Sequence, residues 1–411
     1  MSPYRWLAAL PLAAALASPA VAGPLTFAEA LNRAQSGAPS LQAASLSADA
    51  ARASARSAGA LPDPKLGLSL ENFPVSGPHA GRFGGDEMTM GRIGLQQDVP
   101  NAERRRAARA EAGAAITQAE AARAAEARRV KLGAALAWID LAYAERRLTA
   151  LDQVLKTLAP IWDAQPSAVA SGRARPAQGI RPVEMRAGLE DQRSELAAAT
   201  ARARAELTRW TGEAGPSTAG APPSFEIDPA TLRAGLDTVP ALLVGRAAVN
   251  RADAGVAAAR AAKRPDLGFE VAYGRRDPMF GDMLSAGVTV SLPLFAGRRQ
   301  EPQIAARKAE YASARAQVED TRRTLAAQFE ADWADHVMHH DQWRRTVSVV
   351  VPAAQQRADL ETASYAAGAA GLPDVLDAMT ALADAKLTAL EREAMVARDA
   401  ARIALTYGSA Q

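Results

Sequence analysis

The sequence predicts an α+β membrane protein in which long α-helices carry four β-strands per chain. In residues 265–293, two runs of alternating apolar and small or polar residues flank a turn-rich segment, a pattern typical of a β-hairpin. Residues 64–100 contain a matching pair of runs. The segments 102–159 and 303–351 contain no proline, which predicts long helices. In the first of them, leucines recur every seven residues, which predicts coiled-coil packing.

The two hairpins lie in what we interpret as two internal repeats. Prolines and glycines of the two halves match at a nearly constant separation, 201 residues before the hairpin loops and 192 or 193 after them. The matching pairs are Pro39 and Pro240, Pro64 and Pro265, Gly94 and Gly287, Pro100 and Pro293, and Pro160 and Pro352. Such self-similarity is best identified before any fold is assigned. We therefore predict a first repeat over 23–212, a Gly- and Pro-rich linker over 213–235 and a second repeat over 236–411.

Residues 1–22 have the pattern of a secretory signal peptide. Arg5 provides the positive charge, Leu7–Leu16 form an apolar core and Ala20–Ala22 form a small-residue cleavage site. The mature chain is expected to start at Gly23. No later segment approaches 18 consecutive apolar residues, so we expect no transmembrane helix in the mature chain.

The alternation in the hairpins has two interpretations. It suits strands of a membrane barrel, with Val288 facing lipid and its neighbours Gly287 and Thr289 facing a water-filled interior. It equally suits a soluble hairpin with one buried face. Because roughly eight strands are the usual minimum for a membrane barrel, four strands cannot close one. Either the hairpins are soluble, or several chains share one barrel.

Composition argues against several classes of function. The net charge is only +3, and arginines alternate with acidic residues at helical spacing, as in Glu103–Arg106. This is typical of a solvated helix surface and not of a nucleic-acid interface. There are no cysteines, which excludes disulfides and thiolate metal sites. No nucleophile–base set, phosphate-binding loop or metalloenzyme motif is present, so we predict neither an enzyme nor a cofactor.

Three short motifs recur in the order and spacing of a known family. They are LTFAEAL at Leu25–Leu31, SLPLF at Ser291–Phe295, and Tyr365–Gly368 followed by DVLDA at Asp374–Ala378. With them, essentially the whole mature chain resembles the TolC family of outer-membrane efflux channels. The resemblance implies a homotrimer with a shared twelve-stranded barrel in outer-membrane lipid and a long antiparallel coiled-coil tunnel in the periplasm. It also implies a passive exit channel that works with a periplasmic adaptor (membrane fusion) protein and an inner-membrane RND-type pump.

Two further segments resemble one branch of this family. Leu61–Leu66, and Met88–Met90 before Gly94–Gln97, are similar to the CzcC-like branch, which implies heavy-metal cations as cargo. The chain departs from lipidated members because no cysteine follows the signal, and from TolC itself at Ala370, where that protein has arginine. A general multidrug or type I secretion duct is one alternative. A soluble periplasmic coiled-coil adaptor is another.

The resemblance also implies a pore aperture at Tyr365, Asp374 and Asp377. The two aspartates are three residues apart, so both can lie on one side of a helix start. Threefold assembly would turn them into rings of carboxylates that attract cations. Arg173, Arg175 and Arg181, in the equivalent turn of the first half, are candidate partners. The alternative is helix capping, because Asp374 follows Pro373 at a helix start.

Three histidines form the only other candidate site. His336, His339 and His340 have the spacing of one helix face, and imidazole is a good ligand for zinc and copper. No other histidine lies nearby in the sequence, and polar helix faces are common, so we predict no metal site here. Trp138, Trp333 and Trp343 are interpreted as packing anchors.

Overall fold

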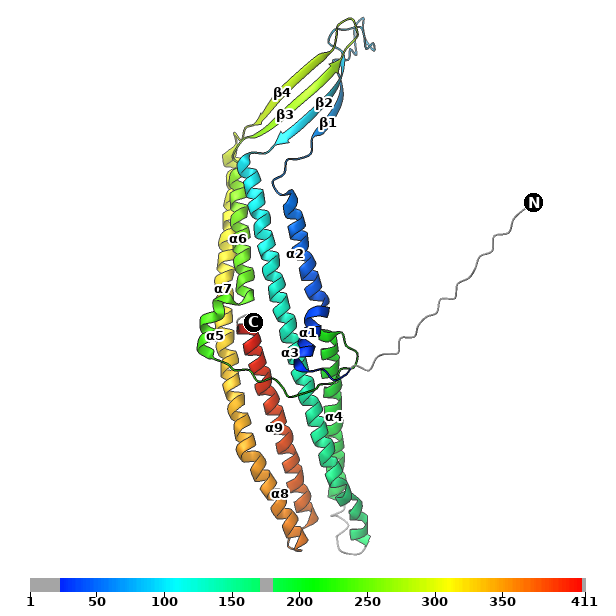
Figure 1. Cartoon of the computed structure of the whole chain (residues 1–411), viewed down its shortest axis with the longest axis vertical. Coiled ribbons are helices and arrows are strands. Elements are labelled where there is room, and N and C mark those ends of the chain that lie inside the picture. Colours follow the sequence, from blue (N-terminus) through cyan, green and yellow to red (C-terminus); the bar gives the residue numbers. More distant parts are fainter. Residues whose placement is uncertain (1–22, 171–179, 409–411) are drawn as a thin grey trace, which may run out of the picture. The chain divides into compact units, whose positions relative to one another are not determined.

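The computed structural model describes residues 23–170 and 180–408. The predicted signal peptide 1–22 and the candidate partners Arg173 and Arg175 lie outside the described residues. The chain is rich in helix and carries one small four-stranded sheet (Figure 1). It divides into two compact units. The helical unit comprises Met1–Ala38, Val130–Glu226 and Trp333–Ala404, and the sheet unit comprises Pro39–Arg129, Ile227–Asp332 and Leu405–Gln411.

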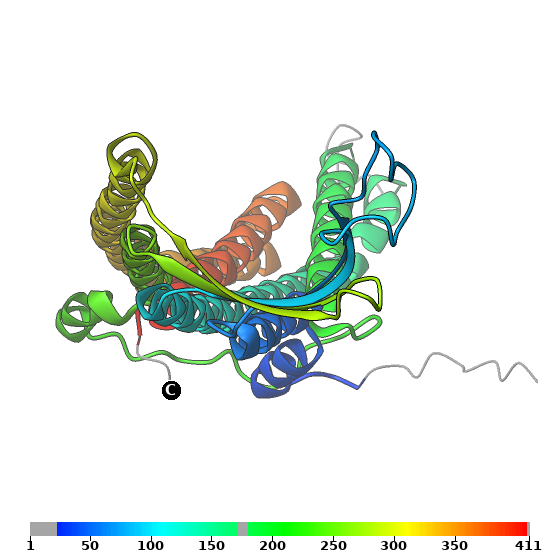
Figure 2. The ribbon, with the colours of Figure 1, turned by 90° about the horizontal axis from the view of Figure 1, so that it is seen from above.

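The sheet unit is built on two hairpins that pair with each other. Its antiparallel order is β1–β2–β3–β4, and the curved sheet is seen from above in Figure 2. The central pairing of β2 with β3 places Leu95 opposite Val271 and so joins the two halves of the sequence. The strands are β1 (Lys65–Glu71), β2 (Met90–Val99), β3 (Asp266–Arg275) and β4 (Met283–Ser291). The four predicted strands are therefore confirmed.

Helices continue directly from the sheet. Besides the strands, the sheet unit contains α2 (Pro39–Ser57), α5 (Pro229–Gly235), η2 (Leu236–Thr238), α6 (Pro240–Ala261) and the first parts of α3 (Ala102–Ala170) and α7 (Ala296–Arg345). Asn101 caps α3, since its Oδ1 accepts the Arg104 N–H at 2.8 Å. Asp266 Oδ1 accepts the Asn101 backbone N–H at 2.8 Å, and Asp266 also pairs with Arg104. This network joins the start of α3 to the start of β3.

The helical unit begins with a capped helix. Thr26 and Glu29 form a capping box at α1 (Phe27–Gly37), in which Glu29 accepts the Thr26 N–H at 2.9 Å and Thr26 accepts the Glu29 N–H at 3.3 Å. The unit also contains the later part of α3, α4 (Ile180–Thr211), the end of α7, the π turn η3 (Thr346–Val350), α8 (Val351–Ala366) and most of α9 (Leu372–Tyr407).

Trp138 is the centre of the main hydrophobic core of this unit. Its side chain is fully buried, and its Nε1–H donates to the Leu25 carbonyl at 2.8 Å. The Phe27 ring meets it edge-on, with ring centroids 5.5 Å apart. Leu207 of α4 and Ala401 of α9 complete the cluster. Trp138 is therefore the packing anchor that the sequence predicts.

A second core follows the seven-residue spacing along the helices. Leu151 and Leu158 of α3 are buried, as are Leu376 and Ala383 of α9. Leu151, Leu158 and Leu376 belong to one cluster with Leu189 of α4. Among the described helices, none combines the length and the apolar character that crossing a membrane requires.

Candidate functional site

The turn between α8 and α9 carries the three predicted aperture residues. α8 ends in a Schellman motif: the Ala369 N–H donates to the Ser364 carbonyl at 2.8 Å, and the Gly368 N–H donates to the Tyr365 carbonyl at 3.0 Å. Gly368 has φ +75°, a conformation that favours glycine. Tyr365 lies in the last turn of α8 with its side chain exposed. The tight turn thus connects the end of α8, which carries Tyr365, to the start of α9 at Leu372.

Asp374 and Asp377 lie in the first two turns of α9 but have different partners. Asp374 Oδ2 accepts the Gly371 backbone N–H at 3.0 Å, which is the geometry of a helix cap. Asp377 Oδ2 accepts from Arg181 Nη2 at 2.6 Å, across to the first turn of α4. The structure therefore joins Asp377 to one of the arginines that the sequence suggests. Asp374 thus caps the start of α9 within one chain.

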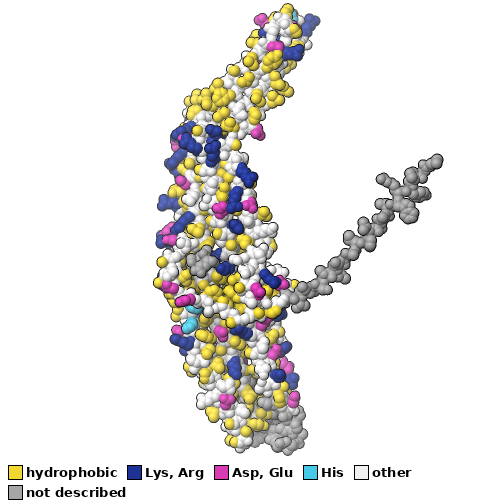
Figure 3. Space-filling model, in the orientation of Figure 1, with side chains coloured by type: hydrophobic (Ala, Val, Ile, Leu, Met, Phe, Trp, Pro, Cys, Tyr) yellow, Lys and Arg dark blue, Asp and Glu magenta, His cyan; other side chains and the backbone are white. Residues whose placement is uncertain are grey.

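The sheet presents two chemically different faces. Alternate residues of all four strands form an apolar face, and its large side chains are exposed in this chain: Leu68 and Leu284 at 76% and Val288 at 65%. The register aligns these residues, with Val288 opposite Phe269 and Leu68 opposite Ile93. In Figure 3, hydrophobic side chains gather over the strands. We call this set the apolar face; its large members are Leu66, Leu68, Leu70, Ile93, Leu95, Leu267, Phe269, Val271, Tyr273, Leu284, Val288 and Val290.

The opposite, polar face contains a line of ion pairs. Arg92 lies between two carboxylates, with Nη1 3.0 Å from Glu71 Oε1 and Nη2 2.6 Å from Glu270 Oε1. Lys65 Nζ lies 2.7 Å from Asp98 Oδ2 on the same face. Sequence reasoning did not single out these charges. The alternation that defines the strands could have found them, because every one lies in phase with the small and polar residues.

The three histidines do not converge on one point. His339 Nδ1 lies 2.7 Å from Asp399 Oδ2 on α9. His336 is half-buried, and burial, with a smaller effect of the neighbouring histidines, lowers the pKa of its imidazole even though Asp399 opposes the shift. Rings of Trp333, His336, His340 and Trp343 follow one another along α7, with centroids 5.7–6.4 Å apart. Within residues 23–170 and 180–408, no group of three His, Asp or Glu side chains is arranged to hold a metal ion.

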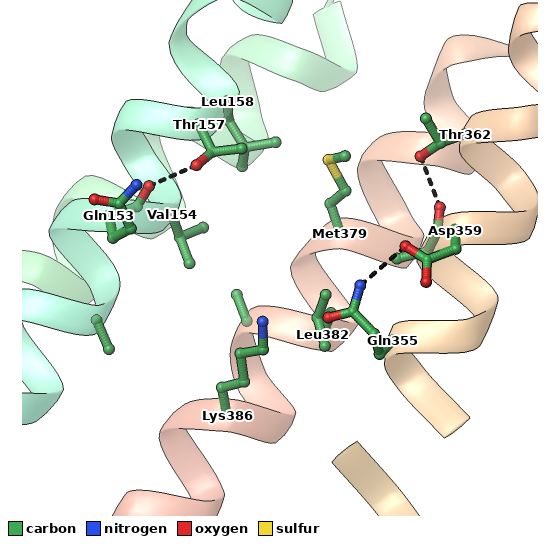
Figure 4. Close-up of a pocket in the computed structure, with 13 residues that line it drawn as sticks. Gln153, Val154, Thr157, Leu158, Gln355, Asp359, Thr362, Met379, Leu382 and Lys386 are labelled. Atoms are coloured by element: carbon green, nitrogen blue, oxygen red, sulfur yellow. Dashed lines mark hydrogen bonds between the residues drawn. The ribbon is translucent and has the colours of Figure 1, made fainter. Parts of the chain in front are cut away.

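An apolar groove of about 430 Å³ runs between α3 and α8, with α9 as its floor (Figure 4). Val154 and Leu158 line it from α3, and Met379 and Leu382 line it from α9. Its polar side chains are Gln153 and Thr157 of α3, Gln355, Asp359 and Thr362 of α8, and Lys386 of α9. Gln355 donates to Asp359 Oδ1 at 2.9 Å. No nucleophile and base lie together here, so the groove offers shape and apolar surface but no catalytic chemistry.

Comparison with protein families identifies one family over part of the chain. Residues 233–409 match the family model described as outer membrane efflux protein. No curated protein sequence matches the chain.

Solved structures match the fold over nearly the whole chain. CusC, described in the context of transmembrane channel formation, has a TM-score of 0.79 at 16% identity, with 93% of this chain and 92% of CusC covered. The CmeC outer membrane channel of Campylobacter jejuni has a TM-score of 0.79 at 14% identity, with 93% and 85% covered. The outer membrane protein VceC of Vibrio cholerae has a TM-score of 0.73 at 22% identity, with 93% and 96% covered. The chain thus has a fold found in outer-membrane channels, and the matches are to channel proteins and not to enzymes.

Proposed function

We propose that this chain is an outer-membrane efflux channel, on the premise that residues 233–409 match the outer membrane efflux protein family and that the whole fold resembles solved channels. The exposed apolar face of the sheet is the observation that carries the proposal. A soluble hairpin would bury one face against its own chain, yet Leu68, Leu284 and Val288 remain exposed. Contiguous apolar surface of this kind marks contact with a membrane or a partner. Lipid on this side and water on the polar side would satisfy both faces.

The strand count supports assembly of several chains. The sheet ends at β1 on one side and β4 on the other, and unpaired strand edges are not stable in lipid. Three copies joined edge to edge would give a closed barrel of twelve strands. In this arrangement the helices would form a periplasmic tunnel, and the chain would act with an adaptor protein and an inner-membrane pump of the RND type. The channel itself would be passive.

Heavy-metal cations are the cargo we propose. The support is the resemblance of Leu61–Leu66 and Met88–Met90 to the CzcC-like branch. On the polar face, the three carboxylates of Glu71, Asp98 and Glu270 outnumber the two cations that pair with them, Lys65 and Arg92, so these residues would give the barrel interior a small net negative charge that attracts cations. A duct for drugs or secreted proteins is the alternative. Metal sensitivity of a strain that lacks the chain, without drug sensitivity, would separate these two cargo classes.

Cell fractionation tests the proposed function. We expect the mature chain in the outer-membrane fraction, and we expect detergent-extracted protein to migrate as a trimer that dissociates on heating. The physical reason is that the apolar face and the two strand edges are satisfied only in a closed assembly within lipid. Recovery of a monomer from the soluble periplasmic fraction would contradict the channel and favour the adaptor alternative.

Ion selectivity tests the proposed aperture. Replacing Asp374 and Asp377 together by alanine is expected to reduce cation preference and block by multivalent cations severalfold, because the carboxylate rings are removed. Single-channel recordings in planar bilayers measure both quantities. Arg181→Ala is the matched control: it breaks the same ion pair but removes positive charge, so cation preference should rise. Unchanged selectivity of the double variant, together with a lower trimer yield, would mean that the aspartates serve only as helix caps.

A further inference from the structure

The helix that leads into the α8–α9 turn is interrupted where proline enters it. α7 ends at Arg345, η3 (Thr346–Val350) is a π turn, and Pro352 is the second residue of α8. Proline has no N–H to donate, and its ring collides with the carbonyl four residues earlier, here Ser348. In the structure the Val351 N–H donates to the Thr346 carbonyl, five residues back. The wider turn therefore lets a continuing helix accommodate Pro352.

Arg392 reaches this turn from α9. Its Nη1 donates to the Gln342 carbonyl at 3.1 Å and to the Thr346 hydroxyl oxygen. The Thr346 hydroxyl in turn donates to the same Gln342 carbonyl at 2.8 Å. Thr346 is fully buried, so its hydroxyl group needs hydrogen-bond partners within the protein, and the Gln342 carbonyl and the Arg392 guanidinium provide them. We call this set of contacts the Arg392 bridge.

The partners of Arg392 differ from those of nearby charges on the same helix. Glu391 pairs with Arg147, and Arg398 pairs with Asp140. No carboxylate of the described residues forms an ion pair with Arg392. Its guanidinium charge instead strengthens hydrogen bonds to two uncharged oxygens, the Gln342 carbonyl in the last turn of α7 and the hydroxyl of Thr346, the first residue of the π turn. The bridge therefore ties α9 to the junction between the last turn of α7 and the first residue of the π turn.

α8 buries few side chains in the single chain. Within the described part of α8, Ala358 is the one buried residue, whereas Leu360 is 61% exposed. Val349 of the π turn is also 61% exposed. Segments with few buried apolar contacts open at low free-energy cost. α3 offers a contrast, because it passes through Pro160 as a regular helix with buried Leu158 and Trp162 on either side.

We propose that residues 346–352 are a hinge for α8, and that the Arg392 bridge holds this hinge in the conformation seen here. α8 supplies one wall of the apolar groove through Gln355, Ala358 and Thr362, so motion about the hinge changes the width of the groove (Figure 4). The inference concerns helices of one chain and does not depend on the proposed channel function. Its test therefore measures conformation and not transport.

Amide hydrogen exchange of the full-length protein tests the bridge. Arg392→Met keeps the length of the side chain and removes its donors, and we expect amide exchange at residues 346–351 to accelerate roughly tenfold. Arg392→Lys should show a smaller change, because its ammonium keeps the positive charge and N–H donors, although in a different geometry. Arg398→Met is the matched control on α9: it loses the ion pair with Asp140 but not the bridge. Arg398→Met should leave amide exchange at residues 346–351 unchanged.

Replacing Pro352 tests whether the effect of Arg392→Met depends on the break in the helix or reflects a general loss of stability. Pro352→Ala restores an N–H four residues after Ser348, so we expect slower amide exchange at 346–351 and a much weaker effect of Arg392→Met in this background. Spin labels at Lys156 of α3 and Leu360 of α8 report the width of the groove, and their distance distribution should broaden in Arg392→Met alone. Equal acceleration in Arg398→Met, an Arg392 effect that persists in Pro352→Ala, or an unchanged label distance would each overturn the proposal.

Discussion

Trp138→Ala is expected to lower the free energy of unfolding by about 3–5 kcal/mol, the usual cost of deleting a buried aromatic side chain. The indole is fully buried, so its removal leaves a large cavity between α1, α3, α4 and α9. It also removes the edge-on contact with Phe27 and the donor to the Leu25 carbonyl. Thermal unfolding of the purified protein, followed by far-ultraviolet circular dichroism, measures the change.

Two further variants show how much of this loss comes from the hydrogen bond and how much depends on the position in the core. Trp138→Phe keeps most of the apolar volume but loses the hydrogen bond at the Leu25 carbonyl, so we expect a loss of about 1–3 kcal/mol. Trp333→Ala removes a half-buried tryptophan outside this core and should cost less than Trp138→Ala. If Trp138→Ala and Trp333→Ala were equally mild, the core assigned to Trp138 would be wrong.

Val288→Arg is expected to impair insertion into the outer membrane at a cost of about 2–4 kcal/mol if the residue lies near the bilayer midplane. Val288 belongs to the apolar face, lies opposite Phe269 and is 65% exposed in the single chain. On the membrane proposal, a guanidinium there would have to enter hydrocarbon. The yield of heat-sensitive trimer in the outer-membrane fraction measures the loss.

Thr289→Arg is the matched control, since Thr289 is the next residue on β4. It lies opposite Gly268 on the polar face, where an added charge would meet water. We expect normal insertion and an altered single-channel conductance. Equal tolerance of arginine at both positions would rule out lipid on the apolar face, and loss of insertion at Thr289 alone would reverse the assignment of the two faces.

Local patterns in the sequence were sufficient for the four strands and for the faces of the sheet, whereas α3 continues past Pro160 to Ala170 and the predicted helix 303–351 is interrupted by a π turn. Alternation of period two determines which side chains share a face, because successive residues of a strand point to opposite sides. Val288 and Gly287 therefore lie on opposite faces whatever surrounds them. The capping box of Thr26 and Glu29 is equally local, since its two hydrogen bonds span three residues. The seven-residue spacing likewise predicts the buried Leu151 and Leu158.

At the candidate aperture, the sequence determined the local geometry but not the partners. That Asp374 caps the start of α9 follows from its position after Pro373. That Asp377 meets Arg181 does not follow, because 196 residues separate them and three arginines were equally eligible. Long-range pairing depends on how helices dock and on which rotamers then reach each other.

The tertiary structure alone explains several residues that a one-dimensional pattern leaves ambiguous. From the sequence alone, Gly133 is expected to destabilise the interior of α3. In the structure, a Cβ at this position would lie 2.1 Å from a ring carbon of Trp210. Glycine therefore allows the indole to pack against the helix. Pro352 predicts a disturbed helix, but only the docking of α9 brings Arg392 to the Gln342 carbonyl. Periodicity specifies which face of a helix is apolar. Contacts between helices also depend on their relative rotation and translation, which side-chain packing across the whole interface determines.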